Sequence, residues 1–285
     1  MPGLTLARKS DNGADMNDAT IVFRKLHSDP SGPLLLPNVW DAGSARLVES
    51  LGAKAVATTS AGVGWALGYP DGNALPVKQL ENLISNILRI VRIPLSVDVE
   101  AGYTHDPKAV GEKLKGILGS GIAGINIEDG TDPTDVLAAK IENVKKTIAS
   151  LGVDVFVNAR TDVYLQSLAP EGQRIKETIA RAQVYRSAGA DGIFVPALSD
   201  PKQIAEIVPA VNMPLNLMTW PGLPDAAELK KLGVHRLSSG SGIPQVIWNH
   251  VARLAKAFLE TGASEPMAQD YMAHDNLQGL FAVKR

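Results

Sequence analysis

The sequence predicts an α/β protein whose parallel strands close into a (β/α)8 barrel. Eight short apolar segments alternate with amphipathic helical segments along the chain. Several helices end in a glycine just before the next apolar segment, as in SLGAKAV, SAGADGI and KLGVHRL, where glycine supplies the left-handed cap. Such alternation gives right-handed crossovers and a parallel sheet, and eight units fit a closed barrel. An open doubly wound sheet needs a glycine-rich turn after its first strand, and NVWDAGSA is a poor match.

The elements follow from this alternation, taken in chain order. Short apolar runs with β-branched residues predict strands, and apolar residues spaced three and four apart predict helices. The predicted strands are 34–39, 53–58, 95–100, 124–128, 155–159, 192–196, 215–218 and 234–238. The predicted helices are 19–26, 77–91, 107–118, 135–150, 172–188, 201–208, 224–232 and 243–260, with a long loop at 64–73 and a short helix at 271–281.

The chain of 285 residues divides into one barrel domain and two terminal segments. We expect a flexible tail at 1–18, the barrel at 19–262 and an extension at 263–285 that packs on the barrel or on a partner subunit. The tail lacks the apolar core of a signal peptide, and Met16 is an alternative start. With no apolar run of about 18 residues, no membrane-spanning helix is expected, and we expect a cytoplasmic protein.

Composition excludes several classes of function. Apolar residues make up 45% of the chain, charged residues 20%, and the net charge is −2 without a long basic run. These values are ordinary for a globular protein and give no support for binding to nucleic acid or to a membrane surface. The chain has no cysteine, so disulfides and thiol catalysis are excluded.

Two acids mark the end of the third predicted strand. Asp98 and Glu100 stand two residues apart, so that on a strand both side chains point to one face. Neighbouring buried carboxylates repel each other unless a cation or a shared proton offsets their charge. Carboxylate oxygens are ligands that Mg²⁺ and Mn²⁺ prefer. The stretch therefore predicts a divalent-metal site, whereas a solvated strand end is the simpler alternative.

Other predicted strands end in polar residues that fit the same site. Barrel enzymes have their active sites at the C-terminal ends of their strands. The fourth strand ends at Glu128 and the fifth is followed by Arg160, whose guanidinium matches a substrate carboxylate. A salt bridge from Arg160 to Asp162 or Glu128 is the structural alternative. Further polar residues at strand ends are Thr58, Thr59, Ser60, Asp71 in a Pro-Asp-Gly turn, His105 as a potential acid or base, and Asn216.

Four motifs together resemble the isocitrate lyase/phosphoenolpyruvate mutase superfamily. They are TTSAG with LGYPDG, SVDVEAGY, GINIEDG and NARTDVY, which occur in the family's order on consecutive strand ends. The resemblance extends over roughly residues 34–260. It implies a (β/α)8 barrel whose eighth helix is exchanged between the subunits of a homodimer or homotetramer. It also implies Mg²⁺, or Mn²⁺, and a small carboxylate substrate.

The resemblance also implies roles for individual residues. Asp98 matches the acid that binds the metal directly, and Arg160 matches the arginine that binds the substrate carboxylate. The acids that hold the metal's waters are matched by Glu100, Asp71 and Glu128. The family's carboxylate-binding segment is matched by Thr58, Thr59 and Ser60.

The chain departs from the family in its acid–base residues. It has no cysteine for the lyases' mobile loop, and Gly130–Asp135 replaces the mutases' Lys-Thr-Asn loop. The lyases' glutamate on the sixth strand is replaced around Pro196. We therefore expect an Mg²⁺-dependent lyase that cleaves a C–C bond of, or decarboxylates, a small 2-oxo or 2-hydroxy acid. The alternatives are P–C chemistry, as in phosphonopyruvate hydrolase or phosphoenolpyruvate mutase, with Thr131 or His105 meeting the phosphoryl group, and a non-catalytic 2-oxo-acid binding protein.

Overall fold

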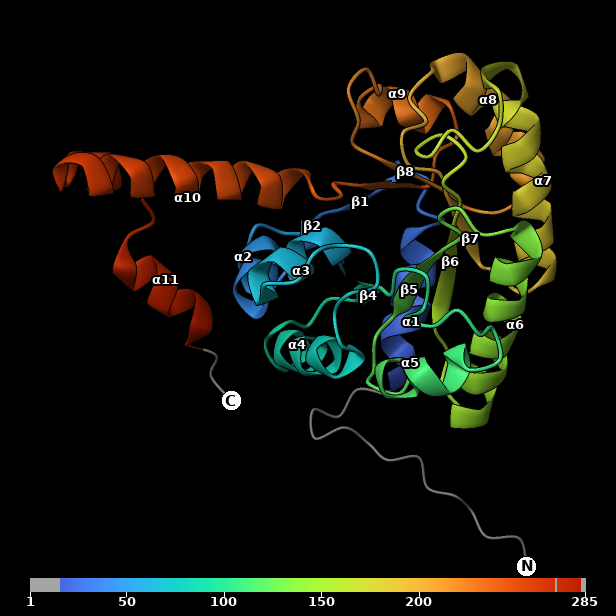
Figure 1. The fold of residues 1–285 in the computed structure, drawn as a ribbon, viewed down its shortest axis with the longest axis horizontal. Coiled ribbons are helices and arrows are strands. Elements are labelled where there is room, and N and C mark those ends of the chain that lie inside the picture. The colour runs from blue at the N-terminus through green and yellow to red at the C-terminus, as the bar shows by residue number, and fades with distance from the viewer. Residues whose placement is uncertain (1–15, 270, 283–285) are drawn as a thin grey trace, which may run out of the picture.

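Parallel strands form a closed barrel in the computed structural model, which describes residues 16–269 and 271–282 (Figure 1). The order of neighbouring strands is β1-β9-β8-β7-β6-β5-β4-β3-β2, and every pair is parallel. The strands are β1 Leu34–Leu36, β2 Asn38–Val39, β3 Val56–Thr58, β4 Leu95–Asp98, β5 Gly124–Glu128, β6 Phe156–Arg160, β7 Gly192–Phe194, β8 Leu215–Met218 and β9 Arg236–Ser238.

Pro37 divides the first predicted strand, 34–39, into β1 and β2. A proline has no N–H group to donate to a strand ladder, and here its carbonyl accepts a hydrogen bond from the Ala57 N–H at 3.1 Å. β1 pairs with β9 while β2 pairs with β3. The two halves of one strand therefore join both ends of the sheet, and nine short strands make an eight-stranded barrel.

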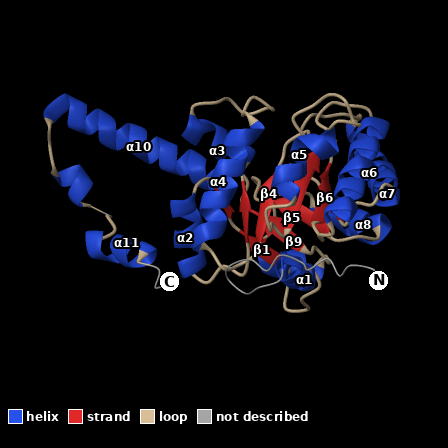
Figure 2. Ribbon diagram, turned by 90° about the horizontal axis from the view of Figure 1, so that it is seen from below, coloured by secondary structure: helices blue, strands red, loops and turns tan. Residues whose placement is uncertain are grey.

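Most of the helices lie around the barrel (Figure 2), and two of them, Ala42–Ser50 and Ser60–Leu67, were not among the predicted helices. They are α1 Met16–Leu26, α2 Ala42–Ser50, α3 Ser60–Leu67, α4 Val77–Ile90, α5 Val110–Leu118, α6 Thr134–Leu151, α7 Arg174–Ser187, α8 Pro201–Val211, α9 Ala226–Lys231, α10 Gly242–Thr261 and α11 His274–Phe281, with short 3₁₀ helices at Glu171–Gln173 and Glu265–Ala268. No helix in the described part of the chain is long and apolar enough to cross a membrane.

Three predicted boundaries were wrong. The first four residues of the loop expected at 64–73 belong to helix α3, which ends at Leu67 and is capped by the left-handed Gly68. β4 ends at Asp98, because Glu100 has a positive φ of 50° that no strand residue adopts, so the two acids do not share a strand face. Helix α1 begins at Met16, within the expected tail 1–18; residues 1–15 of that tail lie outside the described residues.

Helix α1 closes the N-terminal end of the barrel. Its Phe23 is fully buried, and its ring meets that of Phe156 from β6 edge to face at 5.7 Å. Its Arg24 donates hydrogen bonds to Asp154 at 2.9 and 3.0 Å and to Asp191 at 2.8 Å, two residues that precede β6 and β7. This helix therefore covers the N-terminal end of the barrel interior.

Helix α10 leaves the barrel instead of covering it (Figure 1). Most of its side chains are exposed, among them Val246, Trp248, Val251 and Phe258. Next to the start of α10, a cavity of about 740 Å³ lies on the outside of the barrel between α2 and α9. At its base Leu35 of β1 is 54% exposed, although a covering helix normally buries such a strand residue.

The C-terminal extension returns to the barrel. The expected extension begins with the 3₁₀ helix Glu265–Ala268, and the short helix predicted at 271–281 is α11. Arg46 of α2 donates a hydrogen bond from Nε to the carbonyl of Leu280 in α11 at 2.8 Å. The end of the described chain thus packs on α2 of its own barrel.

His27 sits directly after α1 on the barrel floor. Its ring stacks on Phe156 at 4.4 Å, and its Nδ1 bonds to the carbonyl of Phe23 at 2.8 Å. Burial lowers the pKa of His27 to about 3. The positive charge of Arg236 is the second cause, and that of Arg24 adds to the effect. His27 is therefore neutral in the folded protein at pH values where it is protonated in the unfolded chain.

We predict that His27 makes the protein acid-sensitive. Since the unfolded chain binds the proton more tightly than the folded one, the free energy of unfolding should fall by up to about 1.4 kcal/mol per pH unit as the pH drops from about 6.5 towards 3. In the His27→Phe variant this fall should be smaller, as measured by urea denaturation at a series of pH values. The exposed His105→Phe is the matched control. Parallel wild-type and His27→Phe curves would contradict the prediction.

Candidate active site

A cavity of about 190 Å³ opens at the C-terminal ends of the strands. Five residues that the sequence analysis singled out line it: Thr59, Ser60, Asp71, Asp98 and Arg160. They come from the ends of β3, β4 and β6 and from the loop after α3, which are distant in the sequence. Barrel enzymes have their active sites at this end, which makes this cavity the candidate active site.

Asp98 ends β4 and lies among other charges. Its backbone N–H donates to Thr58 Oγ1 at 2.8 Å, and its Oδ1 accepts from the N–H of Glu100 at 3.0 Å. Burial raises the pKa of Asp98 to about 6; the charge of Arg160 opposes this shift, whereas the carboxylates of Glu100 and Asp71 reinforce it. The carboxylates are close enough to repel each other, a situation that a bound cation would relieve.

Glu100 fastens the loop that carries Asp71. Its Oε2 accepts hydrogen bonds from the backbone N–H groups of Gly72, at 2.9 Å, and Asn73. In return, Asn73 Oδ1 accepts from the N–H of Ala101 at 3.2 Å. The loops after α3 and β4 are thereby joined, and Asp71 is held at the cavity. Glu100 itself is 4% exposed and is not among the lining residues.

Arg160 is shared between two carboxylates. Its Nε and NH2 donate to the two oxygens of Asp162 at 2.7 and 3.0 Å, and its NH1 lies 2.7 Å from Glu128 Oε2. Both salt bridges that the sequence analysis considered are present, and the guanidinium still lines the cavity. Burial raises the pKa of Glu128 to about 8, although the charge of Arg160 opposes this shift.

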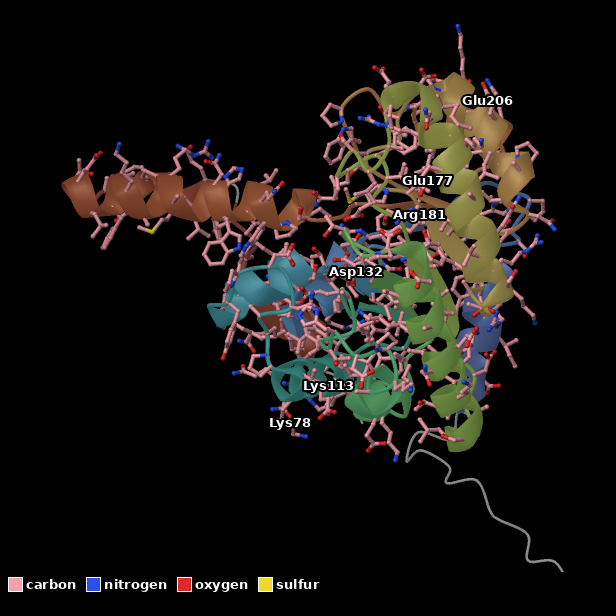
Figure 3. The ribbon with its side chains drawn as sticks, turned by 45° about the vertical axis from the view of Figure 1, so that its right-hand side comes forward. Lys78, Lys113, Asp132, Glu177, Arg181 and Glu206 are labelled. Atoms are coloured by element: carbon pink, nitrogen blue, oxygen red, sulfur yellow. The ribbon has the colours of Figure 1, made fainter. Side chains whose placement is uncertain are left out.

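A second group of residues supports Arg160 from outside the cavity. Asp129 is buried, and its Oδ2 accepts from Arg181 NH1 at 2.8 Å and from the Tyr185 hydroxyl at 2.7 Å. Its Oδ1 accepts from the backbone N–H of Asp162 at 2.9 Å. Arg181 and Glu177 both come from α7 (Figure 3), and Nε of the arginine donates to the glutamate at 2.7 Å. Helix α7 thus fixes the segment that holds the guanidinium.

A layer of amides fills the barrel interior beneath the site. Asn158 Nδ2 donates to Asn126 Oδ1 at 2.9 Å and to Asn216 Oδ1 at 3.1 Å, and the fully buried Arg236 donates from NH2 to Asn126 Oδ1 at 3.2 Å. Asn126 reaches the cavity, whereas Asn216 does not line it. The predicted substrate-binding Asn216 is therefore part of this supporting layer.

Three more predicted residues lie elsewhere than expected. Thr58 is buried below the lining, and Glu128 reaches the site through Arg160. His105 is exposed on the loop after β4 and does not line the cavity. The predicted carboxylate cradle is the start of α3: Thr59 is its N-cap and Ser60 its first residue, so backbone N–H groups of the first turn have no partner within the helix.

The sequence analysis missed Asp129 and Arg236. Alternation along β5 places Asp129 on the face opposite Glu128, where no site residue was expected. Arg181 and Tyr185 are four residues apart, so both donors lie on one helix face. This spacing was the signal in the sequence that a buried acceptor such as Asp129 faces that helix. A buried arginine inside a barrel has no comparable signal in the sequence.

The residues at the cavity fit a hard divalent cation. Among the described residues, no group of three or more His, Cys, Asp or Glu side chains is arranged to hold a metal ion. Mg²⁺, however, retains several waters and needs only one or two carboxylates. Asp98 and Asp71 both line the cavity and present carboxylate oxygens, the ligand type that such an ion prefers.

Comparison with known proteins places this geometry in a family. The sequence profile of the phosphoenolpyruvate phosphomutase family matches residues 23–259. An uncharacterized protein of Mycobacterium tuberculosis is 36% identical over 255 residues, which cover 87% of this chain and 93% of that protein. An oxaloacetate decarboxylase of Pseudomonas entomophila is 28% identical over 80% of each chain.

A solved structure extends the likeness to three dimensions. A candidate phosphonomutase from Burkholderia cenocepacia J2315 matches with a TM-score of 0.79 at 37% sequence identity, covering 84% of this chain and all of that one. The family profile spans most of the chain, including every strand of the barrel and the lining of the cavity. The chain therefore belongs to the phosphoenolpyruvate mutase/isocitrate lyase superfamily.

Proposed function

We propose that this protein is an Mg²⁺-dependent lyase that acts on a small 2-oxo or 2-hydroxy acid by C–C cleavage or decarboxylation. The observation that supports it best is that Asp98 and Arg160, from β4 and β6, line one cavity at the strand ends. One is suited to a hard cation and the other to a carboxylate. The likeness to an oxaloacetate decarboxylase is in keeping with this assignment.

Each residue has a role in this proposal. Asp98 would hold Mg²⁺ directly, and Asp71, which also lines the cavity, would receive hydrogen bonds from its waters. Glu100 would act by holding the loop of Asp71, and Glu128 by pairing with Arg160. When bound, the cation supplies Lewis-acid stabilisation for negative charge on the substrate's 2-oxygen. Arg160 binds the substrate carboxylate and orients the bond to be cleaved.

The first turn of α3 contributes to the same pocket. The backbone N–H groups that follow Thr59 would donate to an anionic group of the substrate, because negative charge is favoured at a helix N-terminus. The P–C alternative has less support, because one of its two candidate residues, His105, is exposed and away from the cavity.

The function is tested by turnover. We expect product from oxaloacetate or from a 2-hydroxy acid such as an alkylmalate, with activity falling to background in EDTA and returning when Mg²⁺ or Mn²⁺ is added. Products would be followed by coupled assay and by NMR. Tight binding of these acids without any metal-dependent product would instead favour the non-catalytic binding protein.

Replacement of Arg160 should weaken carboxylate binding. Arg160→Lys retains the charge but loses the two-point geometry, so the affinity for oxalate should fall roughly 10- to 100-fold, in line with a lost hydrogen bond to a charged group. The affinity for oxalate is measured by calorimetry in the presence of Mg²⁺. Arg186→Lys, an exposed arginine on α7, is the matched control and should bind oxalate as the wild type does. Equal affinities would remove Arg160 from the site.

The hydrogen bonds to Asp129 should matter for the same binding step. Tyr185→Phe removes one donor at 2.7 Å and leaves the ring in place, so the segment around Asp162 loosens and KM should rise about 3- to 10-fold with a smaller change in kcat. The affinity for Mg²⁺, measured separately, should stay unchanged. A parallel loss of Mg²⁺ and substrate affinity would indicate a general loss of structure instead.

We also infer that α10 covers the barrel of a second subunit. Its exposed apolar side chains and the uncovered Leu35 between α2 and α9 support an exchange of this helix in a homodimer or homotetramer. Trp248→Glu should lower the molar mass in light scattering towards that of the monomer. Lys256→Glu, on the same helix, is the control. A wild-type protein that is monomeric would refute the exchange.

A further inference from the structure

The cavity has two chemically different sides, which the strand order sets opposite each other. In an eight-stranded barrel with this order, β7 lies across from β3, and β8 across from β4. On the β3–β4 side the lining includes Thr59, Ser60 and Asp98, with Asp71 from the neighbouring loop. The opposite side comes from β7, β8 and the segments that follow them. A ligand gripped on the polar side therefore extends towards β7 and β8.

The β7–β8 side is apolar. It consists of Phe194, Pro196, Met218 and Trp220, joined by Leu165 from the loop after β6. Phe194 is 4% exposed and Pro196 is buried, so this wall is part of the folded barrel. Trp220 is 39% exposed and stands at the rim. We call these five residues the apolar wall.

The side chain of Met218 occupies space that is free because residue 240 is a glycine. A Cβ added at Gly240 would collide with the sulfur of Met218. Gly240 also has a positive φ of 58°, which favours glycine. Backbone and side chain therefore fit together here, which is expected of a built surface of the pocket.

The cavity offers no second cation for a distal carboxylate. Among its described lining residues the charged ones are Asp71, Asp98 and Arg160. The guanidinium of Arg160 already pairs with Glu128 and Asp162. A second carboxylate pointing to the apolar wall would lose its hydration without gaining a partner, which is strongly unfavourable.

We propose that the substrate carries an uncharged, apolar substituent on the carbon next to its 2-oxo or 2-hydroxy carbon, and that the apolar wall binds this substituent. The inference rests on the proposed function and adds the substrate class. A cavity of about 190 Å³ is smaller than the roughly 300–1,000 Å³ of pockets for drug-sized ligands. The substituent is therefore a small alkyl group of one to about three carbons.

The first experiment is a binding series on the wild-type protein with Mg²⁺, measured by calorimetry. Oxalate has no substituent and serves as the reference. The affinity should rise from pyruvate to 2-oxobutyrate to 2-oxovalerate by about fourfold per added methylene. 2-Oxoglutarate has the carbon chain of 2-oxovalerate with a carboxylate in place of the terminal methyl, and it should bind at least about tenfold more weakly.

The second experiment changes the wall. Met218→Lys supplies a cation and should reverse the preference, so that 2-oxoglutarate binds more tightly than 2-oxovalerate, while Met218→Leu should keep the wild-type order. If the lysine variant does not fold, Trp220→Ala at the exposed rim should reduce the gain from pyruvate to 2-oxovalerate and leave oxalate binding unchanged.

The outcomes separate the two proposals. If oxalate and pyruvate bind but longer alkyl chains bring no gain, or if 2-oxoglutarate binds more tightly than 2-oxovalerate, the assignment of the apolar wall is overturned and the proposed function stands. If neither oxalate nor any 2-oxo acid binds, the proposed function fails, and this inference fails with it.

Discussion

The guanidinium of Arg160 is the positive charge around which the acids at the barrel mouth are arranged. It holds Asp162 with two hydrogen bonds and Glu128 with a third contact, while Asp98 lies within its electrostatic influence. Several largely buried carboxylates lie close together, and one guanidinium offsets only part of their repulsion. The remaining negative charge is what makes a divalent cation the fitting occupant. The proposed sites for the ligand and for the metal therefore depend on the same ion pairs.

This charge cluster is placed by groups that never reach the cavity. Asp129 connects α7 to the backbone of Asp162, and Glu100 connects the two loops on the other side of the site. Beneath them, the amide layer that includes Asn158 makes hydrogen bonds across the barrel interior. Such supporting contacts fix side chains to within the small tolerances that binding and catalysis require.

The sequence predicted most of the fold because helix and strand periods alternate without interruption and glycine caps mark the boundaries. It also identified Asp98 and Arg160, since alternation on strands determines which side chains face inward. It failed where a single residue departs from the regular backbone. Glu100 leaves the strand through a positive φ, and Pro37 breaks a strand that periodicity treats as continuous. Asn216 and Arg236 lie on inward faces as well, but the pattern does not say how deep in the barrel a residue lies.

The apolar wall affects the charged side of the cavity as well as the size of the ligand. An ion pair is stronger where the surroundings are less polarisable, and Phe194 lies beside Arg160, with 5.8 Å between the guanidinium carbon and the ring centre. A ligand whose alkyl group covers this wall would exclude water from the neighbourhood of the guanidinium, so that its carboxylate is bound more tightly than the area of the alkyl group alone would account for. Apolar contact and carboxylate recognition are then coupled in one ligand. A cavity with this arrangement favours a molecule that has both features, and it discriminates against one whose second charge lies against the apolar wall.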